Sequence, residues 1–188
     1  MKTLYLDQNM LYDGTQLKPL WAYLNYKILG PSVVSWQGPC EIDFEHMVDG
    51  EDLNEGAAIR GSLMLHFVFE IFDRDLAFAV ALQRLFVAIL KDQLNQGTAA
   101  LKKRPLIQKG DDLYWGKRKL SISIATVSPV SQLIHLAVNI SNVGTPVKTC
   151  SLQDFKIAPQ RLAERVMELW SQEFDSILRA TQKVRPVG

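Results

Sequence analysis

The sequence lacks the features that mark several specialised classes of protein. Its two cysteines, Cys40 and Cys150, lie far apart and outside any CxxC spacing, which gives no zinc signature and fits a reducing cytosol. Lysine and arginine number 21 against 20 acidic residues, so the net charge is only +1. No bulk electric field therefore recruits nucleic acid or a membrane surface. We expect a cytoplasmic protein with neither as a partner.

Long hydrophobic runs are also missing. The longest apolar stretch, residues 76–90, is interrupted by Gln83 and Arg84. It is shorter than the about 20 apolar residues that a membrane-spanning helix needs. The N-terminus shows no apolar run with a small-residue cleavage site, so we expect no signal peptide. No P-loop, GxGxxG or HExxH motif occurs, which argues against Walker-type nucleotide binding, Rossmann cofactors and zincin proteolysis.

What remains is an ordinary globular composition. The chain has 188 residues, of which 47% are hydrophobic and 22% charged. This predicts a single domain, residues 1–188, that can bury a sizeable core without disulfides or a structural metal. The hydrophobic pattern predicts an α/β protein. We expect strands at 3–8, 32–42, 62–72, 112–115, 119–127 and 133–141, helices at 17–27, at 75–95 and from Pro159, and an acidic loop at 49–55.

Turn residues refine this pattern. Gly38-Pro39 predicts a bend or bulge inside the strand at 32–42. Asp73 or Asp75 could cap the long helix, which Gly97 would end. Pro159 suits the first turn of the last helix. Gly144-Thr145-Pro146 predicts a further turn.

Polar side chains recur on strands that should be buried. Because strand side chains alternate between faces, Lys119, Ser121 and Ser123 should line one side, opposite Leu120, Ile122 and Ile124. In the next strand, His135 and Asn139 share a face in the same way. We expect these two polar sets to meet in a pocket for a small molecule.

Each candidate has a functional and a structural interpretation. Lys119 could neutralise a phosphate or polarise a carbonyl, or its ammonium could simply reach water from a strand end. Ser121 and Ser123 could bind substrate oxygens, although no GxSxG elbow marks either as a nucleophile. His66 and Glu70 lie four residues apart, about 13 Å along a strand, which is too far to chelate one metal.

Buried polar groups need partners. His66 could be a buried histidine hydrogen-bonded to the backbone, and a buried Glu70 carboxylate would need a partner of its own. Asp49, Glu51 and Asp52 could bind magnesium or form a solvated acidic loop. We assign no metal site.

Longer phrases of the chain resemble a family whose activity is unassigned. They are Tyr12-Asp13-Gly14, Gly38-Pro39-Cys40, Met47-Val48-Asp49 with Glu51-Asp52, Met64-Leu65-His66-Phe67 with Glu70, Gly110-Asp111-Asp112-Leu113-Tyr114, Lys119 to Ala125, Gly144 to Val147 and Lys183-Val184-Arg185. Together they resemble domain-of-unknown-function family 366. The resemblance implies the fold of the catalytic domain of biotin and lipoate protein ligases, which is related to class II aminoacyl-tRNA synthetases. It implies a mixed, mainly antiparallel sheet whose apolar face is covered by the long helix and the C-terminal helix.

The resemblance also implies roles. Those ligases carry a lysine that contacts the acyl-adenylate on a strand comparable to that of Lys119, and lipoate-type enzymes often have a histidine where His135 falls. The glycine that follows that histidine is missing here. Arg60-Gly61-Ser62 is the nearest counterpart of their adenylate-binding loop. These departures argue against ATP-dependent adenylation, so the cofactor stays unassigned with ATP as the candidate.

We therefore predict an acyl-transfer or acyl-ligase-like enzyme that acts on a small carboxylated or acylated ligand, or on an acyl carrier. Lys119 would stabilise negative charge, and His135 or His66 would be the general base, because a histidine titrates near working pH. Ser121, Ser123, Asn139, Glu70 and Arg60 would contact or orient substrate. The alternatives are a non-catalytic ligand-binding or assembly module and a metal-assisted hydrolase. Unprotected edge strands predict a homodimer.

Overall fold

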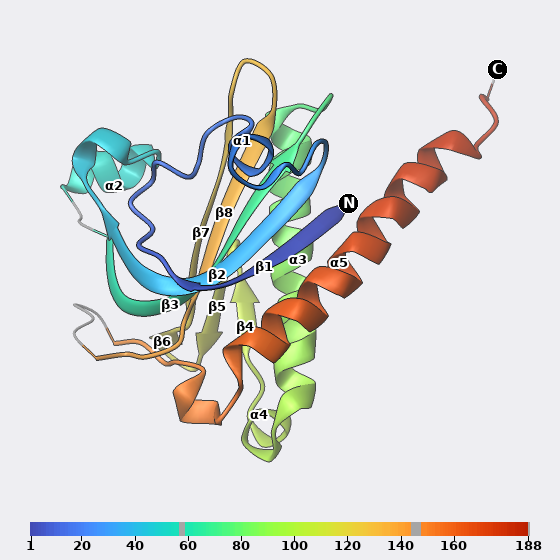
Figure 1. The fold of residues 1–188 in the computed structure, drawn as a ribbon. Coiled ribbons are helices and arrows are strands. Elements are labelled where there is room, and N and C mark those ends of the chain that lie inside the picture. The colour runs from blue at the N-terminus through green and yellow to red at the C-terminus, as the bar shows by residue number, and fades with distance from the viewer. Residues whose placement is uncertain (57–58, 144–147, 188) are drawn as a thin grey trace.

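The computed structural model describes residues 1–56, 59–143 and 148–187, and its centre is a twisted five-stranded sheet (Figure 1). Its strands stand in the order β1-β2-β3-β8-β7. The pairing of β1 with β2 is parallel, and the remaining pairings are antiparallel. The bounds are β1 (Lys2–Asn9), β2 (Ser32–Ile42), β3 (Ile59–Ile71), β7 (Ser121–Val127) and β8 (Gln132–Asn139). The mixed, mainly antiparallel sheet is confirmed.

Two long helices, α3 (Leu76–Gly97) and α5 (Pro159–Gln182), cover one face of this sheet, as predicted (Figure 1). Asp75 caps α3, because its carboxylate accepts a hydrogen bond of 2.7 Å from the backbone N–H of Phe78. In the core between helices and sheet, Phe86 meets Phe69 and Trp170 edge-on, with ring centroids 4.7 and 5.6 Å apart. Neither these helices nor any other in the described ranges is long and apolar enough to cross a membrane.

The opposite face carries shorter elements, α1 (Trp21–Tyr26), a 3-10 turn η1 (Phe44–His46) and α2 (Gly50–Glu55) (Figure 1). A second hydrophobic cluster lies here, built around Tyr12, Trp21 and Trp36. The acidic segment expected as a loop is thus largely helical, and the Asp49 carboxylate caps α2 by accepting a 2.8 Å hydrogen bond from the N–H of Glu51. The predicted turn at Gly144-Thr145-Pro146 lies outside the described residues.

A separate three-stranded sheet splits the strand predicted at 119–127. It consists of β4 (Ile107–Lys109), β5 (Asp112–Trp115) and β6 (Arg118–Lys119), preceded by α4 (Ala99–Lys103), while a 3-10 turn η2 (Gln153–Phe155) leads into α5. Lys119 ends β6, whereas Ser121 begins β7 of the large sheet. Lys119 and His135 therefore stand on different sheets, and the prediction that one polar sheet face carries both is wrong.

The register of β7 against β8 adds a second correction. Ser123 lies opposite Leu136, and Ile124 lies opposite His135. Directly opposed residues share a face of a sheet. Ser121 and Ser123 consequently lie on the face covered by α3, and Ile122 and Ile124 lie on the face of His135 and Asn139. The alternation along the strand was right, but the assignment of its two faces was reversed.

The bulge predicted at Gly38 is confirmed, because the β2–β3 register shifts between Gly38 and Cys40. The chain after β1 crosses at this point. A Cβ atom on residue 38 would collide with the carbonyl oxygen of Met10. That oxygen also accepts a 2.8 Å hydrogen bond from the indole N–H of Trp36. Only glycine permits this backbone approach.

We expect Gly38→Ala to destabilise the protein by about 1–3 kcal/mol or more, because the added methyl group must displace the backbone at Met10. Gly50→Ala is the matched control, since no heavy atom lies within 4 Å of a Cβ added there. Urea unfolding of both variants measures the difference. A Gly38→Ala protein as stable as Gly50→Ala would show that the crossing is not tightly packed.

Candidate functional site

A cavity of about 450 Å³ lies along β7, an edge strand of the large sheet, and residues from both faces of that strand line it. Its lining combines apolar side chains with ionisable ones, and it brings together residues from both sheets, α2 and the chain after β1. Of the residues predicted from the sequence, six line it: Arg60, Lys119, Ser121, Ser123, His135 and Asn139. His66 contacts His135 but does not line the cavity, and Glu70 does not line it either. The cavity thus joins Lys119 to His135 although they belong to different sheets.

Lys119 forms an ion pair with Asp112, with 2.7 Å between Nζ and Oδ2. The β5–β6 pairing sets Lys119 opposite Tyr114, so Asp112, two residues earlier on the same face, is its diagonal neighbour. The two side chains are 33% and 18% exposed. The second carboxylate oxygen of Asp112 is buried without a hydrogen-bond partner among the described residues.

Burial disfavours the charged form of both partners, but the ion pair outweighs this effect on the pKa of Lys119 alone. It lowers the pKa of Lys119, but the hydrogen bond and charge of Asp112 outweigh it, so the pKa of Lys119 ends above its ordinary value. Burial raises the pKa of Asp112, and Lys119 only partly offsets this. The raised pKa of Asp112 means that burial disfavours its charged form more than Lys119 stabilises it. Lys119 is fully charged at neutral pH.

Asn139 fixes the backbone beside this ion pair. Its amide donates to the carbonyl oxygens of Cys150 at 3.2 Å and of Lys119 at 3.4 Å, and its backbone N–H donates to Leu120 at 2.9 Å. These bonds tie the end of β8 to β6. Asn139 therefore positions Lys119, with its amide N–H groups directed to backbone oxygens.

The hydroxyl groups of both serines are engaged inside the protein. Ser121 Oγ accepts a 2.9 Å hydrogen bond from the backbone N–H of Leu113. Ser123 Oγ lies 3.1 Å from an Asp111 carboxylate oxygen and accepts a 2.8 Å bond from the Gln83 amide. They hold the small sheet and α3 against β7, so a role in contacting substrate is not supported by their partners. Gln83, a buried polar residue that interrupts the apolar run at the start of α3, is the sequence signal that could have found this cluster.

His66 and His135 form a buried pair on the cavity side. His66 Nδ1 lies 3.1 Å from His135 Nε2, and His66 Nε2 lies 3.1 Å from the carbonyl oxygen of Gly38. Burial lowers the pKa of His66 to about 4. Burial, with the neighbouring His66, also holds the pKa of His135 well below its ordinary value. Both rings are neutral at pH 7, so the premise that either titrates near the working pH does not hold.

Tyr12, which the sequence analysis named only within a family phrase and not as a site residue, stacks on His135 with ring centroids 3.6 Å apart and planes 9° from parallel. It belongs to the chain that crosses Gly38, and its backbone pairs with Cys40. Burial raises the pKa of Tyr12, so its phenol stays protonated. Periodicity could not find it, because it lies between elements and reaches the site through a long-range backbone pairing.

Glu70 and Arg60 have other partners. One Glu70 carboxylate oxygen accepts 2.7 Å hydrogen bonds from the N–H of Leu20 and the hydroxyl of Ser131. It holds Leu20 in a left-handed backbone conformation with φ of 63°. Its partners are structural, and it does not line the cavity. Arg60 is exposed at the start of β3, with its Nε 3.6 Å from Glu41.

The acidic residues of α2 face the same cavity. Asp49, Glu51 and Asp52 line it, and burial together with the charge of Asp49 raises the pKa of Asp52. Across residues 1–56, 59–143 and 148–187, no three His, Cys, Asp or Glu side chains are grouped so as to hold a metal ion. These carboxylates give the cavity an acidic side around the Lys119 ammonium.

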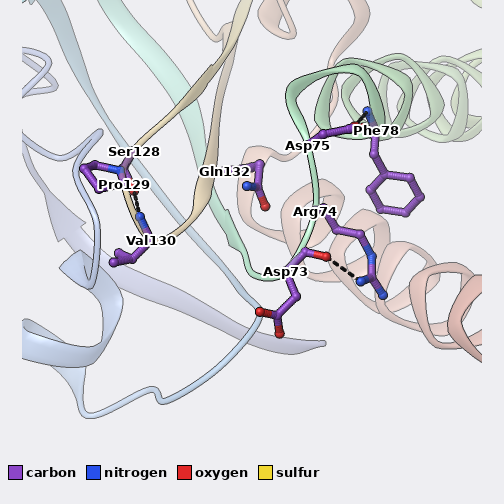
Figure 2. Close-up of a pocket in the computed structure, with 8 residues that line it drawn as sticks. All are labelled: Asp73, Arg74, Asp75, Phe78, Ser128, Pro129, Val130 and Gln132. Atoms are coloured by element: carbon purple, nitrogen blue, oxygen red, sulfur yellow. Dashed lines mark hydrogen bonds between the residues drawn. The ribbon is translucent and has the colours of Figure 1, made fainter.

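A second cavity, of about 590 Å³, lies where the β7–β8 turn approaches the start of α3. Figure 2 shows Gln132 between the turn Ser128–Val130 and the segment Asp73–Asp75. Arg74 there donates to the carbonyl oxygen of Asp73 at 2.6 Å. None of the predicted site residues lines this cavity, so we take the Lys119 cavity as the candidate site.

Known proteins resemble this chain over nearly its whole length. A model of the family described as "Domain of unknown function (DUF366)" matches residues 1–185. An uncharacterized protein of Methanocaldococcus jannaschii is 31% identical over 194 residues, covering 100% of this chain and 86% of that protein. A solved protein of unknown function from Pyrococcus horikoshi is 37% identical, with a TM-score of 0.93 and coverage of 100% and 99%.

More distant structures share the fold. A biotin protein ligase mutant from Aquifex aeolicus, in complex with biotin, has a TM-score of 0.59 at 12% identity, with coverage of 93% of this chain and 70% of the ligase. A T. acidophilum protein with bound lipoic acid has a TM-score of 0.53 at 12% identity, with coverage of 92% and 84%. At such identities the likeness concerns the fold alone. The ligase-like fold implied by the sequence phrases is confirmed.

The buried histidines predict a specific loss of stability in acid. Between the unfolded pKa of 6.5 and the folded pKa of about 4, the unfolded chain binds protons that the native His66 does not. Stability is therefore complete above pH 6.5 and falls below it, by up to about 1.4 kcal/mol per pH unit for each buried histidine. Urea unfolding from pH 7 to pH 5 measures this slope.

The chain has three histidines, and His46 is exposed, so His46→Gln is the control and should keep the wild-type slope. The double variant His66→Gln/His135→Gln should flatten it. An unchanged slope in the double variant would show that carboxylates, and not the two buried histidines, govern stability over this range.

Proposed function

We propose that this chain, which belongs to the DUF366 family and shares its fold with biotin and lipoate protein ligases, binds a small carboxylated or acylated molecule in the Lys119 cavity. The observation that carries the proposal is a charged, partly buried lysine beside apolar side chains in one cavity. Met64, Ile122 and Ile124 offer the surface that an acyl chain needs. Lys119 offers a positive charge to the carboxylate or acyl oxygen of the ligand.

The ion pair leaves Lys119 able to bind. An ammonium group has three N–H donors, and Asp112 accepts from Lys119 through a single oxygen. The other donors are free to reach a carboxylate or acyl oxygen of the ligand. Asp112 in turn holds the lysine at the cavity, and Asn139 fixes the backbone from which it extends.

Lys119 also suits acyl-transfer chemistry. A fixed positive charge stabilises the negative charge that develops on an acyl oxygen when a nucleophile attacks the carbonyl carbon. The two histidines are weak bases because their pKa values are lowered. We therefore assign to Lys119 the stabilisation of charge and to His135 the binding of the ligand, and we look for the nucleophile in a second substrate.

ATP fits this cavity less well than a single acyl group does. Five carboxylates line it, from Asp49, Glu51, Asp52, Asp111 and Asp112, against the cations of Arg60 and Lys119. A triphosphate would meet net repulsion from these carboxylates. The lowered pKa values of both buried histidines also support a second candidate, a module that binds the same ligand without transforming it.

Lys119→Met should weaken the binding of octanoate about ten- to a hundredfold, because it removes a charge-assisted contact of about 1.5–3 kcal/mol and keeps most of the side-chain stem. Isothermal calorimetry measures the affinity. Lys117→Met, on the exposed turn between β5 and β6, is the matched control and should bind as wild type does. Equal affinity in wild type and Lys119→Met would remove Lys119 from the site.

Because Lys119→Met leaves Asp112 unpaired, Lys119→Met/Asp112→Asn separates lost binding from lost stability. The double variant should melt close to wild type and still fail to bind octanoate.

Adding ATP with octanoate distinguishes the two candidate functions. Release of pyrophosphate supports ligase chemistry, whereas tight binding without turnover supports the binding module.

A further inference from the structure

The hydrogen bonds of the histidine pair fix the position of each proton. The Gly38 carbonyl can only accept, so His66 Nε2 must carry a hydrogen. Because neutral imidazole has one donor and one acceptor nitrogen, His66 Nδ1 is then an acceptor. The hydrogen between the two rings must therefore sit on His135 Nε2. This leaves His135 Nδ1 as a lone-pair acceptor.

That acceptor has no partner within the described residues, because the recorded hydrogen bond of His135 uses Nε2 alone. His135 is only 2% exposed, yet it lines the cavity. Tyr12 covers one face of its ring, so the ring edge is what remains for a ligand. Nδ1 is not among the buried side-chain atoms that lack a partner, so it is accessible, and a ligand in the cavity that His135 lines can donate to it.

We infer that the cavity selects a ligand that carries a hydroxyl or amide N–H, which donates to His135 Nδ1, in addition to its carboxylate or acyl oxygen. This inference rests on the proposed function, since it names a second group on the same ligand. A plain fatty acid satisfies Lys119 alone. A hydroxy acid or an amide-bearing acid satisfies both Lys119 and His135.

The proton positions can be measured without a ligand. Long-range proton–nitrogen NMR distinguishes the two neutral imidazole tautomers. The chain has three histidines, so the His46→Gln and His66→Gln variants are enough to assign every imidazole signal. We expect both His66 and His135 as Nε2–H tautomers at pH 7. A hydrogen on Nδ1 of His135 would overturn the inference.

Ligand selection is measured by calorimetry with matched pairs. α-Hydroxyoctanoate and ω-hydroxyoctanoate place a donor near either end of the chain, and each is compared with its methyl ether, which keeps the oxygen but loses the donor. At least one alcohol should bind about tenfold more tightly than its ether. His135→Phe should abolish that ratio, and His135→Gln should retain it, because glutamine supplies both a donor to His66 and an acceptor to the cavity. Melting temperatures are recorded for both variants.

The ratio of alcohol affinity to ether affinity tests the inference about His135, and the absolute affinity tests the proposed function. Lys119→Met should weaken alcohol and ether alike and keep their ratio. Equal affinities for both alcohols and their ethers in wild type, or a ratio that survives His135→Phe, would overturn the inference and leave the proposed function standing. If none of the four acids binds, the proposed function fails, and the inference that rests on it fails with it, whatever the tautomer of His135.

Discussion

A row of hydrogen bonds from the Gly38 carbonyl through His66 to His135 crosses β2, β3 and β8. The position of His135 in the cavity lining depends on this row. The row begins at the bulge in β2, where the Gly38 carbonyl accepts from His66 on β3. The same bulge needs a residue without Cβ, because the Met10 backbone crosses there. The chain after this crossing places Tyr12 on His135. One glycine thus links the strand irregularity to the wall of the cavity.

Lys119 reaches this wall from outside the large sheet. The β5–β6 hairpin sets it beside Asp112, and Asn139 ties its backbone to β8. The cavity therefore combines a neutral hydrogen-bonding surface with a fixed cation. Such a combination matches an amphiphilic ligand with one oxygen-rich end, and it does not need the histidines to act as bases.

Local signals in the sequence were sufficient for much of the fold. The bulged strand at 32–42, the Asp75 cap and the helix from Pro159 each depend on residues close in sequence, and each is present. The faces of β7 depend on long-range packing. Gln83 and Asp111, both distant in sequence, provide hydrogen-bond partners for Ser123 on the face covered by α3. Tyr12 could not be found for the same reason, since only the crossing at Gly38 brings it to His135.

The family likeness and the distant ligases agree on architecture, and the chemistry must be decided at the cavity. Crystals grown with ω-bromooctanoate would locate a ligand directly through anomalous scattering by bromine. The account predicts a carboxylate at Lys119 and bromine beside Met64, Ile122 or Ile124. Bromine in the cavity lined by Ser128 and Gln132, with no ligand at Lys119, would contradict it.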